Sequence, residues 1–310
     1  ILRQLRIPDA EVVHTGFDRP NLELEVLPVA GELDKRAQIL RLLREVEGGG
    51  IIYTATVKAV HELTEFLQGR GLAVASYHGR LKVALRTDNQ DRFMRGELKA
   101  MVATNAFGLG IDKPDIRFVI HHHVPGTLDA YYQEFGRAGR DGAPARCTLL
   151  YEPGDKALQR FFQAGRYPKA EDLVNAHHTL KRLVEAPEPP SLPEIQAISP
   201  VPKTRMKVAL ALFEQRGIVQ QVGRGRYRLV QPDLGPEELA RVGQSYRERD
   251  ERDRLKQQQM VEYAETRSCR WQYLLNYFGK DDDPTPEACG HCDRCTPERF
   301  QTREADLGAA

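Results

Sequence analysis

The stretch Met101-Val-Ala-Thr-Asn-Ala-Phe-Gly-Leu-Gly-Ile-Asp-Lys-Pro-Asp115 begins as a short apolar run and breaks into a loop that contains two glycines. Similar apolar runs lie on both sides of it, and helical patterns separate them. We predict strands at Leu22 to Val26, Ile51 to Thr54, Ala73 to Tyr77, Met101 to Thr104, Phe118 to His121 and Cys147 to Tyr151. We predict helices at Leu33 to Val46, Val57 to Leu67 and Ala84 to Phe93. This alternation predicts an α/β fold, a parallel sheet flanked by helices.

A second informative string is Tyr131-Tyr-Gln-Glu-Phe-Gly-Arg-Ala-Gly-Arg-Asp-Gly142. If Thr127 caps a helix that starts at Leu128, the spacing places Gln133, Arg137 and Arg140 on one helix face. Gly136 and Gly139, next to the arginines, would let a phosphate or another backbone approach closely. Paired guanidinium groups suit a phosphoryl group whose charge spreads over several oxygens during transfer. A plain solvated arginine pair is the alternative interpretation.

The segment from Gln133 to Gly142 resembles the sixth motif of superfamily 2 helicases, in the form found in the RecQ family. The resemblance implies a RecA-like lobe in which Arg140 is the arginine finger on the ATP γ-phosphate. It implies that Arg137 is the companion of Arg140 and that Gln133 belongs to the same network. These three residues are therefore the expected catalytic group.

The segment from Met101 to Asp115 resembles the fifth motif of the same helicases. The resemblance implies that Thr104 and Asn105 contact a DNA phosphate and that Gly110 and Asp112 help to bind the nucleotide. It starts on a strand and continues past the carboxyl end, where open α/β sheets bind ligands. The string Ser76-Tyr-His-Gly-Arg-Leu81 resembles the Tyr-His turn of the family, which implies that His78 lies near the nucleic-acid path. A structural role for that histidine is equally compatible with the sequence.

The string Phe17-Asp-Arg-Pro-Asn-Leu22 resembles the junction between the two RecA-like lobes of the family, so we expect residues 1–21 to be the tail of a missing first lobe. No Gly-x-x-x-x-Gly-Lys-[Ser/Thr] loop and no Asp-Glu-x-His box occurs in the sequence. The parts that hold ATP and Mg²⁺ are thus expected in that N-terminal lobe. We expect this chain, as a fragment, to be inactive by itself.

Four of the five cysteines gather near the C-terminus with C-x19-C-x2-C-x2-C spacing: Cys269, Cys289, Cys292 and Cys295. Four thiolates satisfy the tetrahedral preference of Zn²⁺, which predicts a structural zinc site. A closely similar segment follows the lobe in the RecQ family. An iron–sulfur cluster is the alternative occupant. We expect His291 to be an exposed bystander and Cys147 to be a small buried apolar residue.

A third region follows the proline-rich segment Glu185-Ala-Pro-Glu-Pro-Pro190. Ser191 can cap a short helix, Pro202 can start a second one, and Gly223-Arg-Gly225 can turn a hairpin, which is the order expected of a winged helix. A single long helix is predicted from Pro236 to Thr266. The basic side chains expected to contact DNA are Lys203, Arg205, Arg224, Arg226 and Arg228. A basic hairpin used only for packing is the alternative.

These patterns divide the chain into five parts. We expect a tail of a first lobe at 1–21, the second RecA-like lobe at 22–165, a winged-helix-like domain at 166–235, a long helix with the zinc module at 236–300 and a flexible tail at 301–310. The RecQ family places its winged helix after the cysteines, so the order departs from the family layout. The formal net charge of +1 gives no whole-chain attraction to nucleic acid, so any basic surface is local.

The cysteine pattern fits a reducing compartment, and no run of about 18 apolar residues occurs, so we expect a soluble, cytoplasmic, nucleoid-associated protein. The resemblance implies an ATP-dependent DNA helicase that moves 3′ to 5′ and works in DNA repair or recombination. Its expected partners are single-stranded DNA, duplex junctions and the missing lobe of the same protein, and its expected cofactors are Zn²⁺, ATP and Mg²⁺. The alternatives are a DNA-binding scaffold with a degenerate lobe and an RNA helicase of the DEAD-box kind.

Overall fold

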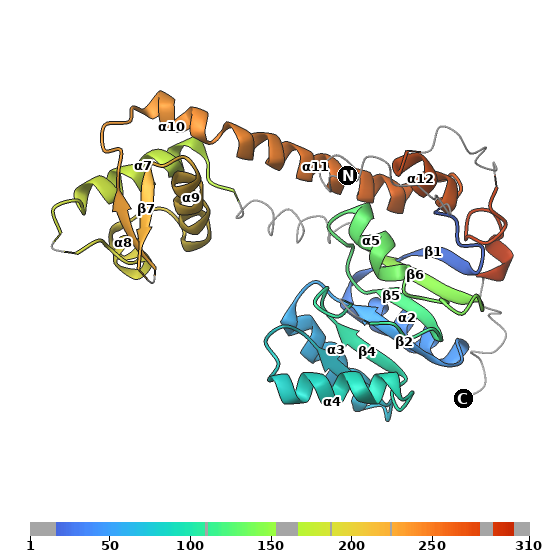
Figure 1. Cartoon of the computed structure of the whole chain (residues 1–310). Coiled ribbons are helices and arrows are strands. Elements are labelled where there is room, and N and C mark those ends of the chain that lie inside the picture. The colour runs from blue at the N-terminus through green and yellow to red at the C-terminus, as the bar shows by residue number, and fades with distance from the viewer. Residues whose placement is uncertain are drawn as a thin grey trace, which may run out of the picture. The chain divides into compact units, whose positions relative to one another are not determined.

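The computed structural model describes residues 17–108, 111–152, 167–186, 188–223, 225–279 and 288–300. The chain divides into two compact units. The sheet unit consists of residues 1–123, 132–151 and 263–310, and the hairpin unit consists of residues 124–131 and 152–262. Figure 1 shows the elements of each. No helix among the described residues is both long and apolar enough to cross a bilayer.

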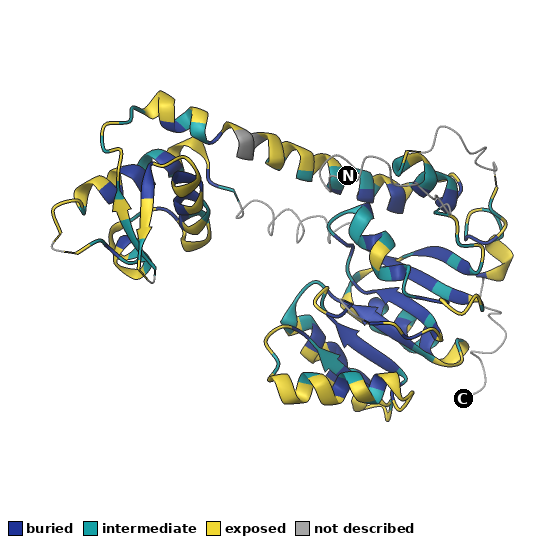
Figure 2. Cartoon of the chain, viewed as in Figure 1, coloured by how far each residue is buried: buried dark blue, intermediate teal, exposed yellow. Residues whose placement is uncertain are grey.

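The sheet unit contains a six-stranded sheet in which every neighbouring pair is parallel, in the order β1-β6-β5-β2-β4-β3. The strands are β1 (Leu22–Pro28), β2 (Gly49–Tyr53), β3 (Val74–Tyr77), β4 (Ala100–Ala103), β5 (Ile116–His121) and β6 (Ala145–Tyr151). All six predicted strands are confirmed, as is the parallel α/β fold. Their residues are mostly buried, as the dark blue strands of Figure 2 show.

Helices connect these strands. They are α2 (Gly31–Glu45), α3 (Val57–Gln68), α4 (Val83–Met94) and α5 (Leu128–Phe135). Of these, α2 and α3 pack against strand residues in one apolar cluster. The N-terminus of α3 is capped by Thr56, whose hydroxyl accepts a hydrogen bond from the Ala59 N–H at 3.1 Å. The buried face of α3 packs with strand residues in one apolar cluster that includes Val60, Leu63, Leu67, Ile52, Val102 and Ile120. The predicted helices in this region are therefore present.

The outer edge of β1 is covered by the segment that carries the last three cysteines. The Leu24 N–H donates to the His291 carbonyl at 3.2 Å, and the Asp293 N–H donates to the Leu24 carbonyl at 2.9 Å. A parallel bridge between Leu24 and Cys292 results. An uncovered strand edge is open to pairing with other chains, and this segment closes it. The cysteine segment, with α12 (Arg270–Tyr277) and the short helix η1 (Pro297–Arg299), is thus part of the sheet unit.

The hairpin unit has the helix, helix, hairpin order that the sequence predicts. Its elements are α7 (Ala170–Arg182), α8 (Leu192–Ile198), α9 (Lys203–Gln215), β7 (Val219–Val222), β8 (Arg226–Leu229), α10 (Pro236–Val242) and most of α11 (Gln244–Glu265). Glu194 accepts hydrogen bonds from the backbone N–H and hydroxyl of Ser191 at the start of α8. A separate apolar cluster includes Leu173, Ile195, Leu210, Phe213 and Val219. This small α+β unit therefore has its own core.

The prediction of one long helix from Pro236 to Thr266 is wrong. The helix breaks after Val242, and a second helix begins at Gln244. Glycine at position 243 weakens helix continuation, and a Cβ there would lie 2.7 Å from the Leu173 Cδ1 atom of α7. Close packing of α7 therefore coincides with the break. The polar pattern of the region hid it, because charged residues run through both helices.

Candidate functional site

The turn that carries the two arginines begins where α5 ends, at Phe135. The predicted cap at its other end is confirmed, since the Thr127 hydroxyl accepts from the Ala130 N–H at 3.1 Å. The prediction that Gln133, Arg137 and Arg140 share one helix face is wrong, because only Gln133 is helical. Gly139 has a φ of +54°, which ends right-handed helical geometry and favours glycine. The arginines are therefore placed by the turn, not by helix periodicity.

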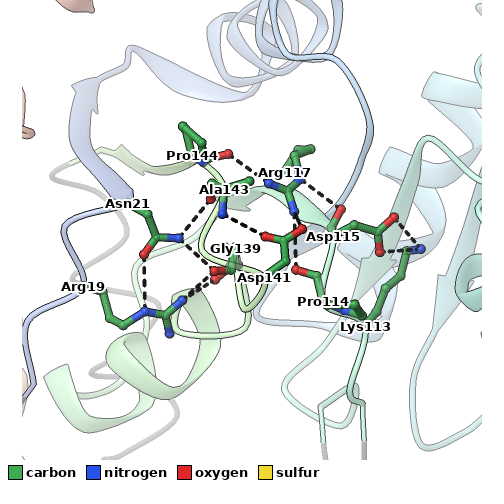
Figure 3. A network of polar contacts seen from close by, with 11 residues as sticks. Arg19, Asn21, Lys113, Pro114, Asp115, Arg117, Gly139, Asp141, Ala143 and Pro144 are labelled. Carbon is green, nitrogen blue, oxygen red and sulfur yellow. Dashed lines mark hydrogen bonds and ion pairs between the residues drawn. The ribbon is translucent and has the colours of Figure 1, made fainter. Parts of the chain in front are cut away.

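Two residues from the segment before β1 hold this turn, as Figure 3 shows. The Arg19 guanidinium donates to the carbonyls of Ala138 and Gly139 at 3.1 and 2.8 Å. The Asn21 amide donates to the carbonyls of Gly139 and Ala143 at 2.8 and 2.9 Å. A Cβ on Gly139 would lie 2.5 Å from the Asn21 Nδ2 atom. The close approach expected at this glycine is thus made by Asn21.

A second anchor acts on the other side of Arg140. Asp141 forms an ion pair with Arg117, and its carboxylate accepts a hydrogen bond from the Ala143 N–H at 3.0 Å. The hydrogen bond from Arg117 lowers the pKa of Asp141. Arg117 also donates to the carbonyls of Pro114 and Pro144. Arg140 therefore lies between two residues whose positions are fixed by separate contacts. The sequence motifs do not predict these anchoring interactions. Arg19 and Asn21 do belong to the string Phe17 to Leu22, which resembles the junction between the two lobes.

Arg140 itself is accessible. Its side chain is 37% exposed, and it pairs with Asp112, 85% exposed, at 2.5 Å. A further hydrogen bond runs to the Ile111 carbonyl at 3.3 Å. Exposed ion pairs contribute about 0 to 1 kcal/mol, so a competing anion can displace Asp112 at little cost. Gly110, the other expected nucleotide residue of this loop, lies outside the described residues.

Arg137 is less exposed than Arg140. Its guanidinium donates to the Gly108 carbonyl, which connects the turn to the loop after β4. Its Nε atom is buried without a hydrogen-bond partner among the described residues. The Tyr53 hydroxyl donates a hydrogen bond to the Phe107 carbonyl at 2.9 Å. Burial raises the pKa of Tyr53, and the positive charge of Arg137 partly opposes this rise. This hydrogen bond joins the two segments that resemble the fifth and sixth helicase motifs. Gln133 is exposed.

The expected DNA-contacting residues of the sheet unit lie at the carboxyl ends of the neighbouring strands β3 and β4. Thr104 is half-buried and accepts from the Ala106 N–H at 3.4 Å, and Asn105 is exposed. His78 is only 2% exposed, and its Nε2 atom lies 3.0 Å from the Nε2 atom of His61. Burial lowers the pKa of His78. His78 is therefore buried against His61, Thr104 is half-buried, and Asn105 is exposed to solvent.

The four cysteines converge as the spacing predicts. Their sulfur atoms lie within 4.8 Å of one another, and the Sγ atoms of Cys289 and Cys295 are 3.9 Å apart. Tetrahedral Zn²⁺ with Zn–S bonds of about 2.3 Å separates sulfurs by about 3.8 Å, so the group fits the ion. Cys269 caps α12, since its Sγ atom accepts a hydrogen bond from the Gln272 N–H at 3.5 Å. The four residues form a zinc-binding site with no position left for a substrate.

Two neighbours of the zinc site complete its anchorage. Arg270 is fully buried and pairs with Asp293 through two bonds of 2.9 and 3.0 Å. The Trp271 indole N–H donates to the Leu22 carbonyl at 3.3 Å. The prediction of an exposed His291 is wrong, because the ring is 9% exposed and packs near Trp271, although it lies outside the four-sulfur group. Cys147 is fully buried in β6, as expected.

Among the described residues of the hairpin unit, the basic side chains expected to contact DNA divide into an ion-paired group and an exposed group. Arg226 pairs with Glu188 and Glu194, and Arg205 pairs with Asp172 at 3.2 Å. Lys203 and Arg228 are exposed, and Arg224 lies outside the described residues. The alternation of side chains along β8 puts Arg226 and Arg228 on the same face, so it could not predict that they differ in ion pairing. The acids that pair with Arg226 come from other segments of the chain. Lys203 and Arg228 are therefore the described candidates of this set for phosphate contacts.

The anchoring of the arginine turn gives a first prediction. Asn21→Ala should lower the free energy of unfolding by about 1 to 3 kcal/mol, because two backbone carbonyls lose their donors. Denaturant titration followed by circular dichroism measures the change. Asn276→Ala, which alters an exposed asparagine on α12, is the matched control and should leave the midpoint nearly unchanged. Equal midpoints for both variants would show that Asn21 does not support the turn.

Comparisons with known proteins match the part of the chain that carries the arginine turn and the part that carries the four cysteines. Residues 34–142 match the model of the helicase conserved C-terminal domain, and residues 229–296 match the model of the RecQ zinc-binding family. The chain is 33% identical over 305 residues to the ATP-dependent DNA helicase RecQ of Synechocystis sp., covering 95% of this chain and 59% of that protein. It is 32% identical over 310 residues to the ATP-dependent DNA helicase RecQ of Bacillus subtilis, covering 99% of this chain and 38% of that protein.

Among solved structures, the C-terminal domain of the DEAD-box protein Dbp5 is similar to 46% of this chain, with a TM-score of 0.40 and 27% identity, and 86% of that domain is covered. The chain spans 59% and 38% of the lengths of the two RecQ relatives, so each relative contains sequence that this chain does not match.

Proposed function

Because this chain is the C-terminal portion of a RecQ-family superfamily 2 helicase, we propose that the whole protein hydrolyses ATP to unwind DNA. In this proposal the sheet unit is the second RecA-like lobe, and a first lobe holds the nucleotide and its Mg²⁺. The accessible Arg140, fixed between two anchored residues, carries the proposal. It is a cation held in place but neutralised only by a weak, exposed pair.

Each residue of the turn has a separate task in ATP hydrolysis. Arg140 exchanges the Asp112 carboxylate for the γ-phosphate and stabilises the charge that develops there. Arg137 keeps the turn attached to the loop after β4 through Gly108, and Gln133 stands exposed at the end of α5 toward the same nucleotide. Asp112 then holds the unengaged Arg140 when no nucleotide is bound.

DNA would contact both units. Thr104 and Asn105 bind the phosphate backbone at the carboxyl edge of the sheet, with His78 shaping the adjoining turn. Lys203 and Arg228 of the winged-helix-like part add phosphate contacts that read no sequence.

The proposal is tested by the polarity of unwinding. The full-length protein should unwind a duplex with a 3′ single-stranded tail in the presence of ATP and Mg²⁺, and a duplex with a 5′ tail much more slowly. A strand-displacement assay on both substrates measures this. A DNA-binding scaffold would bind both and hydrolyse no ATP, and an RNA helicase would prefer RNA duplexes, so either result would overturn the proposal.

The DNA-binding residues of the hairpin unit give a separate prediction. Charge reversal of Lys203 and Arg228 to Glu should weaken the binding of this chain to single-stranded DNA about tenfold or more at low salt. It should also flatten the dependence of log affinity on log salt by roughly 0.7 for each phosphate that is no longer neutralised. Fluorescence anisotropy at several salt concentrations measures both. Arg44→Glu, an exposed reversal in the last turn of α2, is the control. Unchanged affinity and slope in the double variant would remove the hairpin unit from the DNA path.

A further inference from the structure

Two histidines from different elements are in contact near the carboxyl edge of the sheet. His61 belongs to the second turn of α3, the helix that follows β2, and His78 directly follows β3. Their Nε2 atoms are 3.0 Å apart, and their rings meet edge to face with centroids 4.8 Å apart. His78 is 2% exposed, whereas His61 is open to solvent. His61 has no part in the function proposed above.

The hydrogen bonds of His78 determine where its proton lies. Its Nδ1 atom accepts a hydrogen bond from the Arg80 N–H at 3.3 Å, so that nitrogen carries no proton. Because an imidazole ring keeps at least one N–H group, the proton of His78 is on Nε2. Burial lowers the pKa of His78, which favours this neutral form. His78 is therefore the donor in its contact with His61.

This donor determines the tautomer of His61 in turn. The Nε2 atom of His61 accepts the proton of His78, so the proton of neutral His61 is on Nδ1. Within the part of the chain that the structure describes, no hydrogen bond reaches this Nδ1 atom, and the residue is exposed. The pair thus presents a neutral N–H donor, in a fixed tautomer, at the surface of the sheet unit.

The surroundings of this donor favour an anion. Arg80 and Lys82 follow His78 in the turn before α4, and both are exposed and form no ion pair among the described residues. The end of β4 is adjacent, since the Thr104 N–H donates to the Tyr77 carbonyl at 3.2 Å. The histidine pair therefore adjoins the edge at which Thr104 and Asn105 are proposed to bind a DNA phosphate.

We propose that His61 is a further DNA-binding residue, which donates from Nδ1 to a phosphate oxygen of single-stranded DNA, and that His78 positions it. The proposal rests on the proposed function, because it needs DNA to pass along this edge of the sheet. Arg80 and Lys82 supply positive charge that attracts the strand, and the neutral imidazole supplies a directed hydrogen bond. The buried His78 acts through His61 and does not itself contact DNA.

Replacement of His61 by glutamine tests the donor, because the glutamine carbonyl can replace Nε2 as the acceptor while the Nδ1 donor is lost. At about pH 8, where imidazole is neutral, His61→Gln should weaken the binding of this chain to single-stranded DNA about fivefold. The slope of log affinity against log salt should stay unchanged, since a neutral donor releases no counterion. His78→Phe, which removes the positioning donor, should weaken binding to a similar degree. His178→Gln, which removes an exposed histidine of α7, should bind like wild type.

NMR of the chain labelled at the histidine nitrogens tests the tautomer independently of affinity. The signals that disappear in His61→Gln should show a protonated Nδ1 atom and an unprotonated Nε2 atom, and they should shift when single-stranded DNA is added. Circular dichroism checks that each variant keeps the fold. A histidine pair that only stabilises the turn would show neither the shift with DNA nor the loss of affinity in His61→Gln.

The proposal is overturned if His61→Gln binds DNA as tightly as wild type, or if His61 carries its proton on Nε2. A reduced salt slope in His61→Gln would also overturn it, because His61 would then bind as a cation. Thr104→Ala and Asn105→Ala test the proposed DNA path separately. Weaker binding in these two variants with unchanged binding in His61→Gln would remove His61 alone. Unchanged binding in all three would remove this edge of the sheet from the DNA path as well.

Discussion

Full-length protein with Arg140→Ala is expected to lose ATP turnover by about a thousandfold, because an arginine finger stabilises charge that appears only in the transition state. Nucleotide affinity should change only a few-fold, since in the proposed function a first lobe would hold most of the nucleotide. Steady-state hydrolysis in the presence of single-stranded DNA measures turnover, and a fluorescent nucleotide analogue measures affinity. The structure favours a specific effect, since the side chain is accessible and its pair with Asp112 contributes little to folding.

Two further variants make this result interpretable. Arg95→Ala removes an exposed arginine that pairs with Glu97 at the end of α4, and it should retain turnover. Arg140→Lys keeps the charge but loses the planar pair of donors, so it should recover only part of the rate. If Arg140→Ala hydrolyses ATP at the wild-type rate, the residue is not the finger. A parallel loss of nucleotide binding would instead indicate a ground-state role.

The sequence predicted the sheet well because its signal is local. Each strand of the sheet unit is a short buried run, and each run is bounded by polar residues or glycine, so the pattern needs no distant information. The predicted helix face for Arg137 and Arg140 failed because Gly139 adopts a positive φ through contacts with Asn21 and Ala143. Asn21 lies more than a hundred residues away in the sequence, and Ala143 lies across the turn. The helical periodicity of the sequence gives no information about either contact.

The same limit explains what the sequence missed around the metal ligands. Cysteine spacing predicts that four sulfurs meet, since thiolates two residues apart in a turn can reach one ion. It does not predict that Asp293 pairs with Arg270 or that the segment adds to the edge of β1. The sequence likewise does not predict the ion pair of His122 with Glu32, which forms because α2 begins beside the end of β5. The folded structure, and not the spacing in the sequence, brings these residues into contact.

Removal of the zinc is expected to release the C-terminal segment from the sheet unit. The binding of structural zinc contributes about 10 kcal/mol or more in small zinc domains, comparable to the whole stability of a domain. Without the ion, four thiols replace the bound thiolates, and the buried Arg270 to Asp293 pair must hold the segment on β1. Breaking a buried ion pair costs several kcal/mol only while its surroundings stay dry. Chelation should therefore lower the melting temperature by many degrees.

The single tryptophan of the chain reports this release directly. Trp271 is 1% exposed, and its indole N–H donates to the Leu22 carbonyl, so its emission should shift to longer wavelength once the segment detaches. Cys292→Ser should produce the same shift without chelator, because that sulfur is fully buried beside Leu24. Cys147→Ala removes a buried cysteine outside the group and should keep both the zinc and the emission. An unshifted spectrum after complete metal loss would mean that the backbone bonds to Leu24 and the pair with Arg270 hold the segment by themselves, and the zinc would then serve a purpose other than attachment.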